Sequence, residues 1–437
     1  MDATTIGIAG FVGLIIILLI TGIPVGIGMG VVGFLGILVM SGSKIALNAL
    51  YQIPYSSTAS WLLSVIPMFV LMGYVAFYCG FARDVFGAAY KWVSRLPGGL
   101  ALTTLVAGAA FGACCGSSVA ATAALGKLAI PEMMRYKYNR GLAAGTAAMA
   151  GTLSALIPPS ILLVLYGVVT ETSIGELLIA GILPGLLSMT CFTLLVLGRT
   201  MLRPELAPRG EKFAWSEKFA TLKNPGVWGI IIIFAAVVGG IYSGIFSPTE
   251  AGALGAFVSI ALGLVMRRLK WQNFKEILYE TLKTTSYIFL IIIGAYIFVR
   301  FLALSRLPVE LAEWVVILPV PRILIMIAVI IVYLILGCFM DAIGLLLLTV
   351  PFMSPSLFAL GFIPIQLGII VVKMLEIGLL TPPVGIQAYV LKGVAPDLTF
   401  KDIFSGFLPF FLVDLFVVIS LIVAFPQISL FLPTMMK

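Results

Sequence analysis

The sequence contains no histidine and very little charge. Of its 437 residues, 10% are charged and 61% are hydrophobic. The absence of histidine excludes histidine acid–base catalysis, histidine metal sites and a histidine proton relay. The low charge excludes a soluble globular protein, and nucleic acid is not expected as a partner although the net charge is +8.

Motifs for nucleotide, metal and redox chemistry are also missing. No G-x-x-x-x-G-K-[S/T] stretch occurs, so the chain is not expected to hydrolyse ATP. The five cysteines lie in apolar or nearly apolar stretches without metal-ligand spacing, and we expect them to be small packing residues. They are Cys79, Cys114, Cys115, Cys191 and Cys338. Carboxylates within the apolar runs are too sparse for a protease dyad, so neither an enzyme nor a bound cofactor is predicted.

Long apolar runs dominate what is present. Runs of about 20 residues recur along the chain and do not alternate with polar residues, which predicts an all-α polytopic membrane protein in a lipid bilayer. The first five residues lack a basic segment and a cleavage site, so the run that starts at Ile6 is expected to be a retained helix. Such a protein could be a carrier or a channel. A channel conducts much faster than a carrier transports, so a measurement of flux would distinguish the two.

Two apolar runs are each interrupted by a double proline. Pro158-Pro159 lies within the run 141–169, and Pro382-Pro383 lies within 365–391, 224 residues later. Proline removes backbone donors and disfavours helix at the preceding residue, so each run is predicted to be a broken transmembrane helix. Its loose backbone is tolerated in a membrane only against protein or a polar cavity.

Two further runs have the length and interruptions of re-entrant hairpins. The run 100–131 is interrupted at 112–118, which leaves two arms of about 12 to 14 residues, short for a membrane span. The run 323–351 is interrupted at 337–341. Pro131 is expected to close the first hairpin, and Pro351 corresponds to it 220 residues later.

The corresponding breaks and hairpins predict two repeats. Residues 1–225 form the first, with an amphipathic cytoplasmic segment at 199–224, and residues 226–437 form the second. Threading the runs through a bilayer puts 19 of the 26 Lys and Arg residues on one side and 4 on the other. The positive-inside rule makes the first side cytoplasmic. The two repeats then have inverted topology, an arrangement found in alternating-access carriers.

The broken segments are the candidate coupling-ion sites, because loose carbonyls and hydroxyls supply the oxygen ligands that sodium prefers. The first predicted sodium site consists of Gly116, Ser117, Ser118, Gly151, Thr152, Ile157 and Pro158. The second consists of Gly337, Met340, Asp341, Thr381 and Pro382. The alternative is that the small residues only allow close helix packing.

Four residues are candidates for substrate binding: Arg300, Asp341, Ser118 and Ser160. Arginine in a membrane run is costly, so Arg300 is a candidate partner for a substrate carboxylate or for Asp341. Arg300 also lies near the end of its run, where it could instead reach the membrane interface. Weaker candidates are Lys127, Glu250, Lys373 and Glu376, and both lysines could simply reach the interface.

Six stretches resemble one family, the large membrane subunit of tripartite ATP-independent periplasmic (TRAP) transporters. In the first half they are F-G-A-C-C-G-S-S-V-A-A-T from Phe111, G-T-L-S-A-L-I-P-P-S from Gly151 and A-G-I-L-P-G from Ala180. In the second half they are S-P-T-E-A-G-A from Ser247, G-C-F-M-D-A from Gly337 and G-L-L-T-P-P-V-G-I-Q from Gly378.

This resemblance implies a function and its partners. It implies a sodium-driven importer of organic acids, such as C4-dicarboxylates or sialic acids, in the bacterial cytoplasmic membrane. It further implies an elevator mechanism, a small four-helix membrane subunit, a periplasmic substrate-binding protein, and no cofactor other than the coupling sodium ions. The alternative is a stand-alone sodium-coupled divalent anion symporter, which would need no binding protein.

Overall fold

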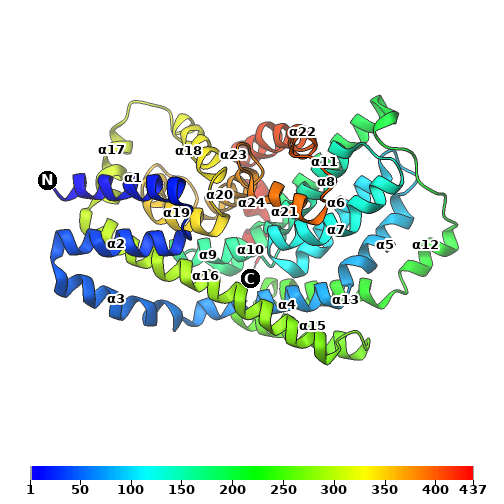
Figure 1. Ribbon diagram of the computed structural model, residues 1–437, viewed down its shortest axis with the longest axis horizontal. Helices are drawn as coiled ribbons and strands as arrows, with labels where there is room; N and C mark the ends of the chain where they lie inside the picture. The colour runs from blue at the N-terminus through cyan, green and yellow to red at the C-terminus, as the bar shows by residue number, and fades with distance from the viewer. Residues whose placement is uncertain (1, 437) are drawn as a thin grey trace.

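The computed structural model describes residues 2–436, and over these residues the chain is helical without strands. Eight helical stretches in this part of the chain are long and apolar enough to cross a membrane. The protein is therefore an all-α polytopic membrane protein, as the sequence predicts. Figure 1 shows helices from distant parts of the sequence packed side by side.

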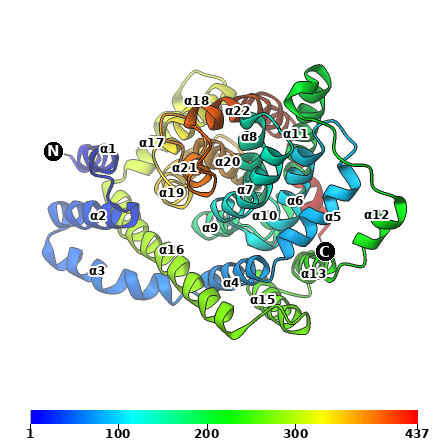
Figure 2. The ribbon, with the colours of Figure 1, turned by 45° about the vertical axis from the view of Figure 1, so that its right-hand side comes forward.

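The helices fall into two groups, which we call outer and central. The outer group flanks one side of the molecule and continues along its lower edge (Figures 1 and 2). Its main helices are α1 (Ala3–Thr21), α2 (Val25–Ser41), α3 (Ser43–Thr58), α4 (Val65–Tyr78), α5 (Phe81–Val93), α13 (Pro225–Phe234), α15 (Pro248–Val265), α16 (Trp271–Ser305) and α17 (Leu307–Ile317).

The central group contains both predicted hairpins and both broken helices. Its first-half helices are α6 (Gly99–Cys115), α7 (Ser118–Arg135), α8 (Arg140–Thr152), α9 (Ile161–Thr170), α10 (Ile174–Ala180) and α11 (Ile182–Leu202). Its second-half helices are α18 (Arg322–Gly337), α19 (Ala342–Ala359), α20 (Pro364–Gly378), α21 (Ile386–Val394), α22 (Phe400–Val413), α23 (Ser420–Ala424) and α24 (Gln427–Thr434).

Glycines allow the outer helices to pack closely. Gly26 and Gly33 of α2 lie directly against the α16 backbone at Ile291 and Phe298, where an added methyl group would clash. Small residues let membrane helices approach in this way, which compensates for the absence of a hydrophobic driving force between helices in lipid. In Figure 2, α16 runs diagonally along the lower side and joins the region of α1–α3 to that of α4 and α15.

A capping box explains part of the motif S-P-T-E-A-G-A. The Ser247 hydroxyl caps α15, Pro248 occupies its first turn, and the Glu250 carboxylate accepts a hydrogen bond from the Ser247 backbone at 2.8 Å. These interactions satisfy backbone donors that the start of a helix leaves free. Glu250 therefore has a structural role.

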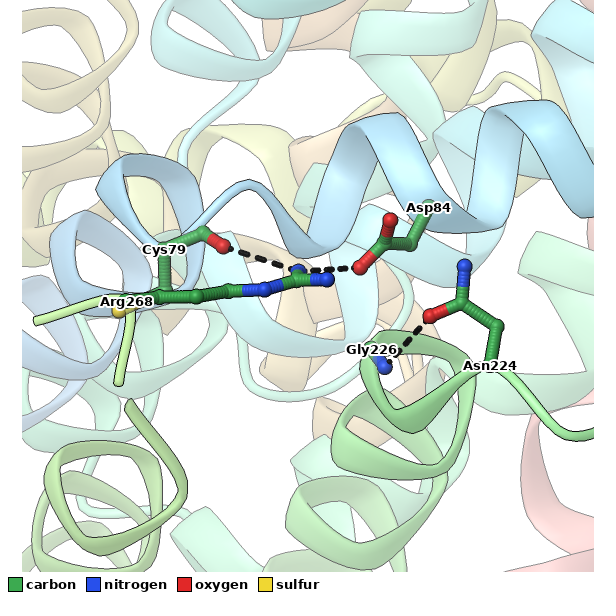
Figure 3. A network of polar contacts seen from close by, with 5 residues as sticks. All are labelled: Cys79, Asp84, Asn224, Gly226 and Arg268. Atoms are coloured by element: carbon green, nitrogen blue, oxygen red, sulfur yellow. Dashed lines mark hydrogen bonds and ion pairs between the residues drawn. The ribbon is translucent and has the colours of Figure 1, made fainter. Parts of the chain in front are cut away.

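An ion pair joins the two halves at the outer group. Arg268, just before α16, pairs with Asp84 of α5, and it donates a hydrogen bond to the Cys79 carbonyl at 3.2 Å. Figure 3 shows these residues beside the start of α13, where Asn224 accepts a hydrogen bond from the Gly226 backbone. Gly226 lies against Asp84, leaving no room for a larger residue.

Three boundaries differ from the prediction. The hairpin arms are helices of 16 to 18 residues: α6 continues to Cys115, and α7 and α19 continue through Pro131 and Pro351. The segment 267–283 continues into the following span as one 35-residue helix, α16. Within 199–224, only α12 (Trp215–Thr221) forms a separate α-helix, and Trp215 packs edge-on against Trp92 of α5.

Candidate functional site

The first hairpin tip lies against the break of the first broken helix. Gly116 ends α6 in a left-handed conformation with φ of 64°, and Ser117 caps α7. A methyl group on Gly116 would come within 2.8 Å of the Pro159 carbonyl oxygen. The Ile161 backbone also donates a hydrogen bond to the Gly116 carbonyl at 3.4 Å. The tip and the break are thus joined through backbone, as the sequence predicts.

The first break is buried throughout. It lies between α8 and α9, and its last residue, Ser160, caps α9 and donates a hydrogen bond to the Ala155 carbonyl. The Thr152 hydroxyl donates to the Met149 carbonyl at 2.9 Å. A hydroxyl that donates in this way keeps its lone pairs free to face a cation. This part of the chain therefore offers several oxygen atoms without adding charge.

The second tip and break repeat this arrangement. Asp341 caps α19 by accepting a hydrogen bond from the Gly344 backbone at 2.9 Å. The Gly385 backbone donates to the Cys338 carbonyl at 3.3 Å, and the Cys338 thiol lies 3.1 Å from the Pro382 carbonyl oxygen. The close approach of Gly337 to Gly378 brings the hairpin and the helix into contact.

The second break differs from the first in its exposure. Pro382 is exposed and Thr381 is half-buried, whereas their counterparts Pro158 and Ile157 are buried. The Thr381 hydroxyl donates to the Ile377 carbonyl at 2.8 Å. The predicted second site is consequently more open than the first.

Each predicted sodium site draws its residues together at one tip and one break. In the first half, Gly151 also packs against Thr122 of α7. In the second, Met340 is buried beside Asp341 at the tip. The assignment of individual ion ligands stays a prediction. In each half, however, the tip and the break lie next to each other, as such a site requires.

A cavity of about 370 Å³ lies between the first hairpin and the outer group. Cys115, Ser117 and Lys127 line its hairpin side. Tyr74 of α4 and Thr284 of α16 line the opposite side, and their hydroxyls are 2.9 Å apart. The first tip therefore faces a cavity between the outer and the central group.

Arg300 does not join the hairpin tips. Its side chain is exposed and lines a cavity of about 420 Å³, together with Tyr296 of the same helix and Ser56, Ser57 and Ser60 from the end of α3 and the segment after it. Asp341 instead contacts Tyr287, which lies 13 residues earlier on α16 and hence about 20 Å along the helix axis. Of the alternatives for Arg300, the pairing with Asp341 is therefore wrong for this conformation.

Sequence reasoning underestimated a buried charged cluster. Lys373 does not reach the membrane interface, because it is 2% exposed, pairs with Asp414 at 2.6 Å and donates to the Ser188 hydroxyl at 3.1 Å. Glu376, one turn further along α20, is 1% exposed and accepts a hydrogen bond from Gln387 at 3.2 Å. The spacing of Lys373 and Glu376 inside an apolar run was the available signal.

Known proteins resemble this chain over almost its full length. The family model of the "Tripartite ATP-independent periplasmic transporter, DctM component" matches residues 12–428. The sialic acid TRAP transporter large permease protein SiaM of Vibrio cholerae is 35% identical, covering 95% of this chain and 96% of SiaM. The C4-dicarboxylate TRAP transporter large permease protein DctM of Pseudomonas aeruginosa is also 35% identical, covering 93% of each chain.

Two more distant similarities concern another TRAP permease and a solved structure. The ectoine TRAP transporter large permease protein TeaC of Halomonas elongata is 29% identical over 98% of both chains. Among solved structures, the Alcanivorax borkumensis YdaH transporter superposes with a TM-score of 0.60 at 17% identity, covering 89% of this chain and 90% of YdaH. At that identity, the likeness concerns the fold alone.

Proposed function

The chain belongs to the family of DctM components of tripartite ATP-independent periplasmic transporters, and from this premise we propose that it is the large transmembrane subunit of a sodium-driven importer of organic acids. The observation that carries the sodium assignment is the pairing of each hairpin tip with the proline break of its own half. At both places, oxygen atoms of loose backbone and short side chains gather inside the membrane-spanning part of the protein, where a hard cation can replace water.

The proposed mechanism is an elevator. The central group carries both tips and both breaks, and the outer group presents α4 and α16 to them as a fixed wall. The cavity beside Ser117 supports this division, because it lies between the two groups rather than within either one. In this proposal the central group moves as a unit, with sodium and substrate bound between the tips.

Four residues are proposed to contact the substrate. Ser118, Ser160 and Asp341 surround the tips, while Arg300 contributes from the outer cavity lined by Tyr296 and serine residues. An arginine beside several hydroxyls suits a carboxylate, since guanidinium is a fixed cation with planar donors. Asp341 contacts α16 roughly 20 Å along the helix axis from Arg300. In this proposal, the substrate occupies these two positions at different stages of transport.

The proposal includes two partners and a location. Binding-protein-dependent uptake needs a small four-helix membrane subunit and a periplasmic binding protein, and both are proposed to act with this chain in a bacterial cytoplasmic membrane. The substrates named for its relatives include sialic acid and C4-dicarboxylates, so N-acetylneuraminate and succinate are suitable first probes.

Reconstituted uptake tests the proposal. The chain and its small subunit are placed in liposomes, and entry of the radiolabelled probes is measured with and without the binding protein and an inward sodium gradient. We expect uptake only when both are present, and Arg300→Ala is expected to abolish it. Equal uptake without sodium contradicts the proposal, and uptake without the binding protein supports a stand-alone symporter instead. Full uptake by Arg300→Ala makes Arg300 an interface anchor.

A further inference from the structure

The buried cluster around α20 contains one more negative charge than positive charge. Lys373 is the cation, and Asp414 and Glu376 are the carboxylates, all at most 2% exposed. Lys373 already pairs with Asp414 at 2.6 Å, so Glu376 is the carboxylate without a full counter-charge. A lone charge in such surroundings is costly unless a partner neutralises it.

One oxygen of Glu376 lacks a hydrogen-bond partner in the described part of the chain. Its Oε2 accepts a hydrogen bond from the Gln387 amide at 3.2 Å, but Oε1 is buried and has no hydrogen-bond partner among residues 2–436. Buried polar atoms are almost always satisfied, so an orphan oxygen indicates a missing ion or water. Because the carboxylate also lacks a counter-charge, either a proton or a metal cation accounts for both observations, and counting bound sodium distinguishes the two.

Oxygen atoms from a second element surround this carboxylate. The Ser118 side chain, in the first turn of α7, contacts Glu376. The hydroxyl of Thr122, one turn further on, donates a hydrogen bond to Gln387 Oε1 at 3.3 Å. The amino end of α7 contributes about half a positive charge, which offsets the carboxylate only in part. A monovalent cation would complete the balance, whereas a divalent ion would leave an excess of positive charge.

We propose that Glu376 Oε1, the Ser118 hydroxyl and the Gln387 side-chain oxygen bind a third sodium ion, which is centred on α20 and shares Ser118 with the first predicted sodium site. The inference rests on the proposed function, since it takes sodium as the coupling ion. The site joins α7 of the first half to α20 and α21 of the second. An ion there links the two halves of the central group and travels with them.

Direct sodium binding tests this site without knowledge of the substrate. The purified chain in lipid nanodiscs is titrated with ²²Na⁺, and the ions bound per chain are counted for wild type and Glu376→Gln. We expect the variant to bind one sodium fewer. The matched control is Glu250→Gln, the same chemical change at the capping carboxylate of α15, which is expected to bind as many ions as wild type.

The outcomes separate this inference from the proposed function. If Glu376→Gln binds as many ions as wild type while Ser117→Ala binds fewer, the third site is overturned and the sodium sites at the tips stand. If the wild type binds no sodium, both proposals fail. Should Glu376→Gln not fold, Glu376→Asp is expected to keep the full count at a several-fold higher half-saturating concentration, and unchanged affinity overturns the proposal.

Discussion

The two halves of the central group share one backbone plan but differ in chemistry. Ser117 and Asp341, 224 residues apart, both cap the second arm of a hairpin. On α8 and α20, the same offset pairs Met149 with Lys373 and Thr152 with Glu376. The first half thus carries neutral side chains where the second carries charged groups.

The two breaks also differ in burial, and the break of the second half is the more exposed one. The first break is wholly buried, and Gly181 of the α10–α11 junction packs against the Leu156 carbonyl. The second break exposes Pro382 and Pro383. The duplicated frame therefore constrains the position of each tip and break, while the side chains and covering helices decide how polar and how open each site is.

The largest expected effect comes from giving the second half the residue of the first at Lys373. Lys373→Met leaves Asp414 buried without its partner, so we expect a loss of about 3–5 kcal/mol in stability. Thermal unfolding in sodium-free detergent measures the change. The double variant Lys373→Met with Asp414→Leu is expected to recover most of the lost stability. If the single variant Lys373→Met is as stable as wild type, the ion pair contributes little.

A second conversion exchanges the charged tip for the neutral one. Asp341→Ser keeps an oxygen to cap α19 but removes the carboxylate, so we expect sodium affinity to fall about 100-fold, equivalent to roughly 3 kcal/mol. Sodium titration of uptake measures it. Asp341→Ala should fall further, because it loses the cap as well. Equal behaviour of serine and aspartate would remove the distinction drawn between the halves.

The neutral tip should respond less. Ser117→Ala removes one cap and one neutral ligand, for which we expect about 1 kcal/mol in stability and about a tenfold higher half-saturating sodium concentration. Thr381→Ala, at the second break, is expected to weaken sodium dependence in the same way. Wild-type sodium activation in both variants would contradict the assignment of the two tip sites.

The smallest effect is expected in the outer group. The described part of α2 has no side-chain cap, whereas α15 has the Ser247–Glu250 capping box. Glu250→Gln removes the charge from one exposed capping interaction, so we expect a loss of about 0.5 kcal/mol in stability and no change in sodium affinity. A large loss of uptake with normal stability would show that Glu250 acts in transport.

Several features of the central group followed from local sequence. Proline removes a donor wherever it stands, so Pro158 and Pro382 identified both breaks, and the glycine and serine at 116–118 identified a tip. Helix lengths were less predictable. Pro131 and Pro351 were expected to end helices, but they lie inside α7 and α19. Membrane helices tolerate proline where neighbouring groups satisfy the freed backbone.

The sites were predictable only in part. The breaks lie where the sequence predicts, with Thr152 and Thr381 beside them, but the role of these residues as ion ligands stays a prediction. Partners far apart in the chain were not found, because nothing local links Lys373 to Asp414 or Glu376 to Ser118. Arg300 stays a predicted substrate contact, and its alternative pairing with Asp341 is not realised in this conformation.

The sequence by itself determined the all-helical membrane class, the positions of the breaks and tips, and their 224-residue repeat, because hydropathy and proline act through local chemistry. Tertiary structure alone decided which charges are buried and paired. That choice depends on helices hundreds of residues apart meeting at Ser118, Glu376 and Asp414, and only the packed arrangement reveals that one carboxylate there lacks a counter-charge.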